Sequence, residues 1–403
     1  MLAYLFPPIA GAGVQRTLKF VRYLEPLGWQ ATVVSTRSRA YGTRDPSLVA
    51  DIPASARVIR TPALPLARYL AIVLYKLRLR RLRAWVLWPD NGLGWAPFAF
   101  VAALRAARRD RPDVLFSTSA PYGSHLVALL VSRLTGIPWV ADFRDEWTTN
   151  PHLVGQPRPL MALAVRAERA ITARAQRIVV AADYFELVGL DPDDPRRTEI
   201  PNGVDEADLP PASAPGPPAD RFVLAHVGTL YDIRDPSPVL RALAALAEGA
   251  IDGDRVEVRL VGSVWLPGFA PPPEIRLTRT GYVEHARAIQ EMHMATALLL
   301  YVPSSSLAPS GKLFEYLGSG RPLLCLARPD NLGSRLVREW DAGVVADPHD
   351  ETAIAEAILV LWRRWEQEGL PDQEAVRERV LERFSRRAGA ARLAQVLEDA
   401  RRA

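Results

Sequence analysis

The sequence predicts an α/β protein with two doubly wound, Rossmann-like domains that face a central cleft. Three observations support this prediction. Strand–turn–helix units repeat along the chain, the pattern restarts in the second half, and 403 residues exceed what one hydrophobic core usually covers. The stretch at 209–221, LPPASAPGPPADR, is rich in Pro, Ala and Gly and lacks an apolar period, so we interpret it as a linker or a surface loop. Ligands of such sheets bind at the carboxyl ends of the strands.

The predicted organisation has three parts. An N-terminal domain covers 1–205, a C-terminal domain covers 206–380, and a helical tail covers 381–403 and can pack back on the N-terminal domain. In the first half, apolar runs predict strands at 2–6, 31–35, 58–60, 114–117, 139–142 and 177–181. Helical spacing predicts helices at 14–27, 96–109 and 124–135. Gly28 follows the first of these helices and is a typical C-terminal cap.

The second half repeats the same cycle. Strands are predicted at 222–227, 256–261, 278–283, 297–302, 323–327 and 343–345. Ser237 and Pro238 begin a helix that runs to about Glu248, with proline at the favoured first position. The tail from 374 to 403 is basic and has a helical pattern without a further strand.

Composition excludes several classes of protein. Hydrophobic residues make up 49% and charged residues 24% of the chain, and the net charge of +5 is too mild to argue for nucleic acid. The single cysteine, Cys325, excludes an intramolecular disulfide and a multi-cysteine metal site, and its apolar strand predicts a buried, inert thiol. No metalloprotease, serine-hydrolase or phosphate-loop motif occurs. The chain opens without a basic leader and has no apolar run of about 18 residues, so we expect a cytoplasmic protein.

Lys312 and Glu315 lie three residues apart in a predicted short helix, so their side chains share one face of it. Ser310 is a suitable N-cap and Gly311 permits a tight entry. One interpretation of the pair is an exposed ion pair, worth under ~1 kcal/mol. The other is a ligand site, in which the helix amides and Lys312 bind phosphate and the carboxylate of Glu315 holds sugar hydroxyls.

Gly11 and Gly13 lie in GAGVQR, a turn between the first predicted strand and a helix. The turn superficially resembles a dinucleotide-binding fingerprint, but Arg16 replaces the third glycine and no acidic residue ends the second strand. A hydride-transfer enzyme is therefore disfavoured. The glycines either let a ligand approach the backbone closely or form a plain tight turn.

Charged residues follow the predicted strand at 139–142. The run DFRDEW contains Asp142, Arg144 and Asp145, at the carboxyl end of a strand where ligands bind in such sheets. Part of this cluster can be a structural Arg–Asp pair, and part can have a functional role.

A second glycine turn lies in HVGTL at 226–230, between a strand and a capped helix. Gly228 and Thr229 could cradle phosphate there, and Arg234 could bind the same phosphate bidentately. Taken alone, Arg234 is also compatible with an ordinary surface residue.

The segment 68–88, RYLAIVLYKLRLRRLRAWVLW, combines apolar residues, arginines and flanking tryptophans. A basic amphipathic segment can make peripheral contact with an anionic membrane. A helix packed on a sheet also has a basic outer face, and that is the interpretation we favour from the sequence.

In their order and spacing, the motifs resemble those of glycosyltransferases with the GT-B fold, family 4. The resemblance covers nearly the whole chain and rests on FPPIAGAGVQR, WPDNGLGW, STSAPYGSHL, GIPWVADFRDEW, IPNGVD, HVGTL and GKLFEYLGSGRPLL. It implies transfer of a sugar with retention, without a metal or other cofactor, from a nucleotide-diphosphate sugar bound in the C-terminal domain. The acceptor, bound in the N-terminal domain, would be a glycan, a lipid-linked saccharide or a small molecule, and no nucleic acid is expected.

The resemblance also assigns roles to residues. Catalytic roles fall on Asp142, Arg144, Arg234 and Lys312. Donor-binding roles fall on Gly11, Gly13, Gly228, Thr229, Gly281, Tyr282, Ser310, Gly311 and Glu315. Acceptor-side roles fall on Arg16, His125 and Asp145. Within these sets, Arg234 and Lys312 would neutralise the leaving diphosphate, Glu315 would bind the ribose, and the nucleobase would lie near Gly281 and Tyr282.

The chain departs from the family pattern in two places. Leu307 stands where relatives often carry a glutamate that contacts the sugar, and Arg144 stands roughly where they carry a histidine. Two alternatives therefore stay open, a sugar-nucleotide epimerase of the same fold and a non-catalytic nucleotide-sugar-binding protein. The first predicted strand is short at its start, so the native start could lie upstream of Met1.

Overall fold

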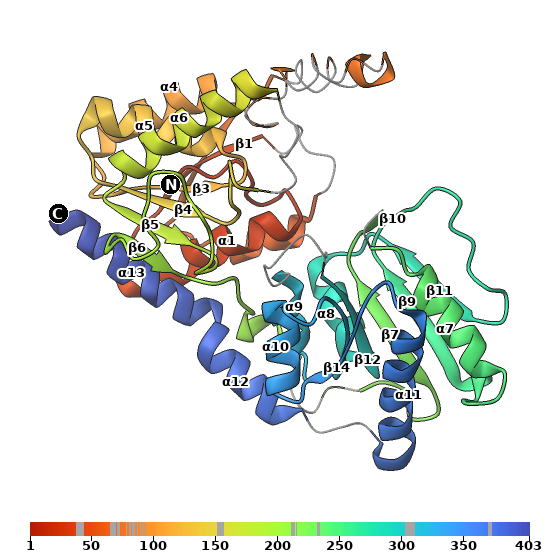
Figure 1. The fold of residues 1–403 in the computed structure, drawn as a ribbon. Coiled ribbons are helices and arrows are strands. Elements are labelled where there is room, and N and C mark those ends of the chain that lie inside the picture. Colours follow the sequence, from red (N-terminus) through yellow and green to blue (C-terminus); the bar gives the residue numbers. More distant parts are fainter. Residues whose placement is uncertain are drawn as a thin grey trace. The chain divides into compact units, whose positions relative to one another are not determined.

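The structure consists of two compact units. Unit 1 comprises Met1–Asn202 and Arg386–Ala403, and unit 2 comprises Gly203–Ser385 (Figure 1). The computed structural model describes residues 1–37, 44–64, 70, 73–77, 79, 82, 85–86, 88, 90, 92, 94–150, 157–210, 214, 216–231, 234–302, 311–369 and 373–403. The domain boundaries predicted after residues 205 and 380 compare with unit boundaries after residues 202 and 385. Of the two interpretations of 209–221, a linker between the units is not what the structure shows, because the described residues of this stretch belong to unit 2 and Leu209 packs in its core.

A parallel sheet forms the centre of unit 1. Its strands are β1 (Thr32–Thr36), β2 (Arg57–Thr61), β3 (Leu115–Ser119), β4 (Trp139–Phe143), β5 (Arg177–Val180) and β6 (Arg197–Glu199). β1 pairs with β2, and β3, β4, β5 and β6 pair in that order, each pair in parallel. All residues of β3 and β4 are buried, although β3 ends in the hydroxyl residues Ser117, Thr118 and Ser119 and β4 contains Asp142.

The segment around Leu2 joins the two sets of strands in unit 1. Leu2 forms a single bridge to Val34 of β1 on one side and to Ser117 of β3 on the other. The continuous strand predicted at 2–6 is therefore wrong, because bridges form only at Leu2. The segment still exchanges backbone hydrogen bonds with β1, from the Ala3 N–H to the Val34 carbonyl and from the Thr36 N–H to the Tyr4 carbonyl. The proline pair that follows has no N–H groups to donate, so pairing cannot continue along the segment. Across the sheet the order is β2, β1, the Leu2 segment, β3, β4, β5 and β6.

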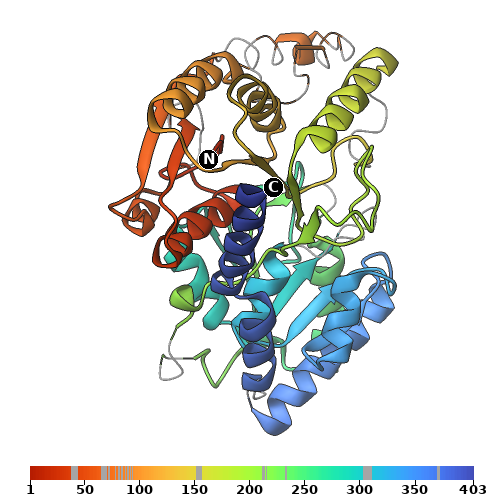
Figure 2. The same cartoon turned by 90° about the vertical axis from the view of Figure 1, so that its left-hand side faces the viewer.

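Helices cover both faces of this sheet. They are α1 (Ala12–Leu24), α4 (Ala96–Asp110), α5 (Gly123–Thr135), α6 (Arg158–Arg174) and α13 (Arg386–Arg402), with single 3-10 turns η1 (Glu25–Leu27) and η3 (Pro46–Asp51). α4, α5 and α6 pack on one face, while α1 and α13 pack together on the other (Figures 1 and 2). Phe20 and Leu24 of α1 share a core cluster with Leu393 and Leu397 of α13. Gly28 ends the first helical stretch with φ of 86°, as a glycine cap does.

Unit 2 is built on a six-stranded parallel sheet. Its strands are β7 (Phe222–Val227), β9 (Val256–Val261), β11 (Arg276–Gly281), β12 (Ala297–Tyr301), β13 (Leu323–Leu326) and β14 (Gly343–Ala346). They lie in the order β11, β9, β7, β12, β13, β14, and two short strands, β8 (Leu230–Tyr231) and β10 (Val264–Trp265), pair separately. Numbered along the chain, the six strands have the order 3-2-1-4-5-6 of a doubly wound Rossmann sheet.

Helices also cover both faces of the sheet in unit 2. They are α7 (Ser237–Ala247), α8 (His285–His293), α9 (Gly311–Gly318), α10 (Leu332–Glu339), α11 (Glu351–Glu368) and α12 (Glu374–Phe384), with 3-10 turns η5 (Glu206–Asp208) and η6 (Gly253–Arg255). The apolar sides of α7 and α11 form one core cluster with the sheet. Those of α8, α9, α10 and α12 form another cluster with alternate residues of the same strands. This two-sided packing is the doubly wound arrangement predicted from the sequence.

Two further sequence expectations concern the thiol and the helices. Cys325 lies in β13 and is fully buried, and burial raises its pKa to about 12, as expected of an inert thiol. In the part of the chain that the structure describes, no helix combines the length and apolar character needed to cross a membrane.

Candidate active site

The sheet of unit 2 has a switch point between β7 and β12. β7 is the first strand of the unit, with β9 and β11 added on one side and β12, β13 and β14 on the other. The connections leave the two central strands in opposite directions, so a crevice opens outside their carboxyl ends, where ligands of this fold bind. Gly228 directly follows β7, and Tyr301 is the last residue of β12. These two residues therefore lie at the centre of the candidate site.

Gly228 leaves room for a side chain from another element. Its N–H donates to the Val261 carbonyl at 2.7 Å, and its φ is 155°. A Cβ placed on Gly228 would lie 2.4 Å from Cε and 3.0 Å from Nζ of Lys312. Lys312 therefore occupies the space that any other side chain at position 228 would fill, which gives the predicted glycine turn a physical reason.

α9 presents Lys312 and Glu315 at this switch point. Its other face is buried against the sheet, and both charged side chains are half-buried. Tyr316 fixes the helix to the end of β7, because its hydroxyl accepts a hydrogen bond from the Val227 N–H at 2.8 Å and donates to the Val227 carbonyl at 3.1 Å. The structure therefore does not show Lys312 and Glu315 as a solvent-exposed ion pair, which was one of the two interpretations of the sequence.

Burial lowers the pKa of Lys312 below its ordinary value, with the Glu315 carboxylate opposing this effect and the Arg234 guanidinium adding to it. A bound anion would favour the protonated ammonium and reverse the shift. A negatively charged ligand would therefore offset the cost of burying the Lys312 ammonium.

Arg234 adds a second cation beside the same glycine turn. Its guanidinium carbon lies 5.2 Å from the centre of the Tyr231 ring. Its Nε is buried and has no hydrogen-bond partner among the described residues. Because Arg234 also contributes to the lowered pKa of His226 and of Lys312, these three groups share one electrostatic environment.

His226 and Tyr301 are site residues that the sequence analysis missed. The Nδ1 of His226 lies 2.8 Å from the Leu299 carbonyl, which can only accept, so Nδ1 carries the proton. Its Nε2 is then a bare acceptor without a partner in the described part of the chain. The Tyr301 hydroxyl is also buried without a hydrogen-bond partner among the described residues. The centres of the His226 and Tyr301 rings lie 5.4 Å apart.

Burial lowers the pKa of His226 to about 3, so the imidazole is neutral at neutral pH. The sequence signal for both residues is a hydrogen-bonding side chain near the carboxyl end of an otherwise apolar strand. The carboxyl ends of β7 and β12 lie side by side at the switch point, and only the strand order shows this.

The predicted nucleobase residues Gly281 and Tyr282 lie on the same edge of the sheet. The Gly262 N–H donates to the Gly281 carbonyl at 2.9 Å, and a Cβ on Gly262 would lie 2.4 Å from the Gly228 carbonyl oxygen. The backbone of Gly262, after β9, thus contacts both Gly228, after β7, and Gly281, at the end of β11. Tyr282 follows them and is 48% exposed.

Arg16 and Asp142 form an ion pair inside unit 1. Nη2 of Arg16 lies 2.8 Å from Oδ1 of Asp142, and the two side chains are 3% and 0% exposed. The Thr118 hydroxyl donates to Oδ2 at 2.7 Å, and Nη1 of Arg16 donates to the Pro201 carbonyl at 3.0 Å. A structural Arg–Asp pair therefore exists in the DFRDEW cluster, but its cation is Arg16 of the glycine turn.

Arg144 holds the loops at the carboxyl edge of unit 1 together. Its guanidinium donates to the carbonyl groups of Gly13, Ser119 and Ala120. A Cβ on Gly13 would lie 2.8 Å from Cδ1 of Leu5 and 3.0 Å from Nη1 of Arg144, so contacts within the protein already account for this glycine. Gly11 precedes α1 with φ of 115°.

The other acceptor-side residues differ in exposure. His125 of α5 is fully buried, its Nδ1 lies 2.7 Å from the Ser117 hydroxyl, and burial lowers its pKa to about 3. Asp145 is exposed, whereas Arg16 and His125 are not. Only Asp145 of this predicted set can meet a ligand without rearrangement.

The remaining predicted residues lie beside β7 and at the start of α9 or outside the described part of the chain. Thr229 is half-buried between β7 and β8, and Gly311 is the exposed first residue of α9. Ser310 and Leu307 lie outside the described residues. Within the described ranges, no group of three or more His, Cys, Asp or Glu residues could hold a metal ion.

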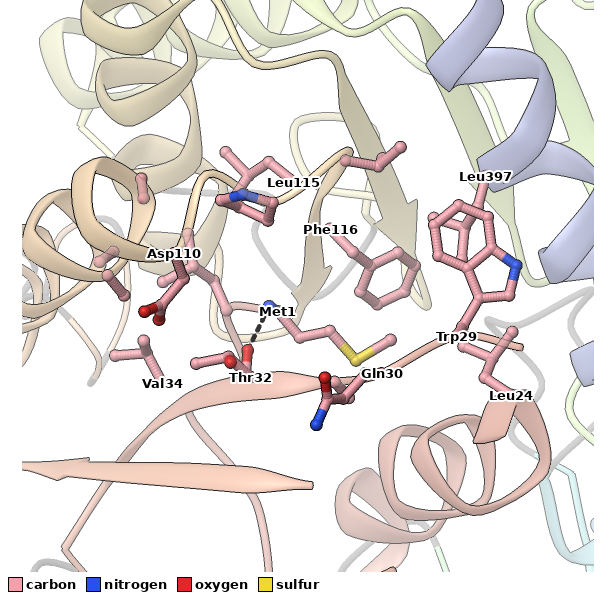
Figure 3. A pocket seen from close by; sticks show the side chains of 17 residues that line it. Met1, Leu24, Trp29, Gln30, Thr32, Val34, Asp110, Leu115, Phe116 and Leu397 are labelled. Carbon is pink, nitrogen blue, oxygen red and sulfur yellow. Dashed lines mark hydrogen bonds between the residues drawn. The ribbon is translucent and has the colours of Figure 1, made fainter. Parts of the chain in front are cut away.

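Unit 1 also contains a cavity of about 110 Å³, which Figure 3 shows. Its lining includes Met1, Thr32, Leu115, Phe116 and Leu397, and the Met1 amino group donates to the Thr32 carbonyl at 2.7 Å. Thr32 begins β1 and Leu115 begins β3, so the cavity lies at the amino ends of the strands. It is therefore at the opposite end of the sheet from the predicted site residues.

Comparison with known proteins agrees with this organisation. Residues 11–203 match the family model of the glycosyl transferase 4-like domain. The chain is 28% identical over 258 residues to D-inositol 3-phosphate glycosyltransferase 1 of Catenulispora acidiphila, covering 58% of this chain and 60% of the relative. It is 28% identical over 303 residues to D-inositol 3-phosphate glycosyltransferase of Thermomonospora curvata, covering 67% and 65%. The match thus spans less than two thirds of the length of either relative.

Solved structures share the fold over nearly the whole chain. A glycosyltransferase from Rickettsia africae superposes with a TM-score of 0.65 at 13% identity, over 99% of this chain and 97% of that one. Anabaena HepE in complex with UDP gives 0.64 at 15% identity, over 98% and 99%. Sucrose-phosphate synthase from Thermosynechococcus elongatus gives 0.62 at 16% identity, over 96% and 93%.

The two doubly wound units and these structural neighbours confirm the fold class predicted from the sequence. The matched residues 11–203 span nearly all of the first segment of unit 1. The chain therefore shares the fold of these solved structures, and its residues 11–203 match the glycosyl transferase 4-like domain.

Proposed function

We propose that the protein is a glycosyltransferase that transfers a sugar, with retention, from a nucleotide-diphosphate sugar to an acceptor hydroxyl. The observation that carries the proposal is the polar cluster at the switch point of unit 2. There, the Lys312 side chain packs against Gly228 near Arg234, and Glu315 lies on the same face of α9 as Lys312. The 4-like domain and the GT-B fold support the same class of reaction.

The two cations suit the leaving group of such a transfer. When the bond from the anomeric carbon to the diphosphate oxygen breaks, its electron pair goes to the diphosphate, and the acceptor oxygen forms the new bond to that carbon. Fixed positive groups stabilise the growing charge more in the transition state than in the ground state. We assign this stabilisation to Lys312 and Arg234, in a reaction that needs no metal ion or other cofactor.

The neighbouring groups suit the rest of a nucleotide sugar. The Glu315 carboxylate can accept hydrogen bonds from ribose hydroxyls, and Thr229 and Gly311 bring backbone to the diphosphate. Gly281 and Tyr282 are assigned to the nucleobase end. HepE, which shares the fold, was solved with UDP, a nucleoside diphosphate, and this supports the assignment of the ligand class.

In unit 1 we assign different kinds of role to the predicted residues. Asp145 is exposed and is proposed to contact the acceptor. Asp142 and Arg144 are proposed to act by positioning, because the first is enclosed by Arg16 and the second is bound to three carbonyl groups. His125 is buried and belongs with these positioning residues. The proposed acceptors are a glycan, a lipid-linked saccharide or a small molecule, and the proposed compartment is the cytoplasm.

Donor binding tests the site directly. Calorimetry with UDP, GDP, dTDP and ADP sugars would identify the donor, and Lys312→Ala should weaken its binding on the order of 10- to 100-fold, because a hydrogen bond to a charged group is lost. Glu315→Ala should also weaken binding. Arg335→Ala and Glu339→Ala, exposed changes on α10, are matched controls that should leave binding intact. Unchanged binding in both site variants would contradict the assignment.

Product analysis separates transfer from the two alternatives. A transferase releases free nucleoside diphosphate only when an acceptor is supplied and forms a new glycoside. An epimerase converts the donor without an acceptor. A binding protein shows calorimetric donor binding with no turnover against a panel of acceptors.

A further inference from the structure

The proposed function leaves two buried polar side chains of unit 2 without a role. His226 near the end of β7 is 2% exposed, and Tyr301 at the end of β12 is 5% exposed. The Nε2 of His226 and the Tyr301 hydroxyl both lack a hydrogen-bond partner among the described residues. A buried polar atom costs free energy while it stays unpaired, so we expect a ligand group or a water molecule to pair with these two atoms.

The two side chains are neighbours at the edge of the proposed diphosphate site. β7 and β12 pair in parallel, and the centres of the two rings lie 5.4 Å apart in an edge-to-face arrangement. The Nε2 of His226 lies 3.3 Å from the position of a Cβ on Gly228, and the Nζ of Lys312 lies 3.0 Å from the same position. The unpaired acceptor is therefore close to the group that we assign to the leaving diphosphate.

The protonation state of His226 restricts what its partner can be. Its Nδ1 carries the proton, so Nε2 can only accept a hydrogen bond. Burial lowers the pKa of the imidazole to about 3, with Lys312 and Arg234 adding to the effect, so Nε2 has no proton at neutral pH. Phosphate oxygens are acceptors and cannot pair with it. A hydroxyl group can, because it donates to Nε2 while its oxygen accepts from the Tyr301 hydroxyl.

The strand order indicates which part of a donor supplies this hydroxyl. The strands lie in the order β11, β9, β7, β12, at a spacing of about 4.8 Å. The nucleobase is assigned to Gly281 at the end of β11, and the diphosphate to Lys312 and Arg234 beside β7. A nucleotide sugar bound along this edge would continue past the diphosphate toward β12, where Tyr301 lies. The part of the molecule that follows the diphosphate is the transferred sugar, which is rich in hydroxyl groups.

We propose that His226 and Tyr301 form a specificity pocket that binds a hydroxyl group of the transferred sugar. The inference rests on the proposed function, because it requires a nucleotide sugar at the switch point of unit 2. The sugar hydroxyl donates to Nε2 of His226 and accepts from the hydroxyl of Tyr301. A donor without a hydroxyl at this position would leave both buried atoms unpaired, so the pair discriminates against that donor.

Calorimetric titration of the full-length protein tests the pocket with matched probes. The probes are UDP-glucose and UDP, GDP-mannose and GDP, dTDP-glucose and dTDP, and ADP-glucose and ADP. For a pair that the wild type binds, the ratio of the two Kd values isolates the contribution of the sugar. Tyr301→Phe and His226→Phe should each weaken binding of the nucleotide sugar about three- to tenfold and leave binding of the nucleoside diphosphate unchanged. Tyr301→Phe removes only an unpartnered oxygen, so this variant should fold like the wild type.

Two control variants act on parts that both probes of a pair share. Glu315→Ala removes a proposed ribose contact, and Tyr316→Phe loosens the attachment of α9 to the end of β7, so the ratio of Kd values should stay as in the wild type. An unchanged ratio in both pocket variants would mean that only water fills the pocket. Equal losses for both probes would place the contact on the ribose or the diphosphate.

Either of these results would overturn the pocket, whereas weaker binding of both probes to Glu315→Ala would still support the proposed function. No binding of any probe to the wild type would overturn both.

Discussion

The carboxyl edges of the two sheets carry similar polar groups in different bonding states. In unit 1, Asp142 is enclosed by Arg16 and Thr118, and the guanidinium of Arg144 is used by three backbone carbonyls. In unit 2, by contrast, an atom of a cationic group lacks a partner among the described residues: Arg234 Nε is buried and unpartnered, beside two polar atoms at the ends of β7 and β12. Unit 1 also has unpartnered buried atoms, such as Thr36 Oγ1 and His125 Nε2, but all of those in its described part belong to uncharged groups.

This difference separates groups that hold a loop from groups that await a ligand. A buried polar atom without a partner costs free energy, and proteins keep such atoms mainly where function uses them. The charges of unit 1 have partners within the protein, so removing them should lower the free energy of unfolding. The polar atoms of unit 2 named above lack such partners, so removing them should lower the affinity for the donor.

The largest expected effect is on the stability of unit 1. Asp142→Asn leaves the Arg16 guanidinium buried without its counter-charge, so the free energy of unfolding should fall by about 3–5 kcal/mol. Asp194→Asn is a matched control, because the Asp194–Arg196 pair of the same unit is partly exposed and should contribute under ~1 kcal/mol. Urea denaturation measures both, and a loss for Asp142→Asn no larger than that of the control would break the comparison.

The next effect is acid destabilisation, with one buried histidine in each unit. His125 and His226 both have a pKa of about 3 against an ordinary value of 6.5, because burial disfavours the charged imidazolium. Below pH 6.5 the unfolded chain takes up protons that the folded chain refuses, so stability is present above pH 6.5 and falls as pH drops toward 3. At pH 5 the loss should be roughly 2 kcal/mol for each histidine.

Urea midpoints at pH 7 and pH 5 measure this loss. His125→Gln and His226→Gln should each show a smaller acid-induced drop than the wild type, and the exposed His349→Ala should show the full drop. Equal drops in all four proteins would show that neither imidazole is held neutral by the fold.

The third effect tests why position 228 is glycine. Gly228→Ala places a Cβ 2.4 Å from Lys312 Cε, so the ammonium must move and donor affinity should fall by about tenfold or more. Gly268→Ala is the matched control, because Gly268 also has positive φ, of 75°, but open space around its Cβ position. The control should lose ~1–2 kcal/mol of stability from backbone strain and keep its donor affinity. Calorimetry that found the same affinity in both variants would remove Lys312 from the donor site.

Much of this fold could be predicted from the sequence, because parallel strands buried on both faces read as apolar runs. The strands predicted at 222–227 and 256–261 have the bounds observed for β7 and β9. The run at 2–6 also shares backbone hydrogen bonds with β1 and β3, but it forms bridges only at Leu2 and is followed by a proline pair that cannot donate. Apolar patterning reports burial, and pairing depends on partners far along the chain.

The site divides in the same way. Helical periodicity alone predicts that Lys312 and Glu315 lie together, because residues three positions apart in a helix share one face. His226 and Tyr301 could not, because a single polar residue in an apolar strand looks like a core residue until the strand order places both ends side by side. The pairing of Arg16 with Asp142 spans 126 positions of the chain and has no local signal.

The smallest effect distinguishes a ligand-binding hydroxyl from a structural one within unit 2. Tyr301→Phe removes a buried hydroxyl that has no described partner, so stability should be unchanged or rise by up to ~1 kcal/mol, while donor affinity should fall severalfold if the donor bonds that hydroxyl. Tyr316→Phe removes a hydroxyl that bonds both polar groups of Val227, so it should lower stability by ~1–2 kcal/mol. Thermal unfolding and donor titration on the two variants measure both quantities. If Tyr301→Phe lost stability like Tyr316→Phe and bound donor like the wild type, the unpartnered atoms of unit 2 would be structural, and the contrast with unit 1 would no longer mark the donor site.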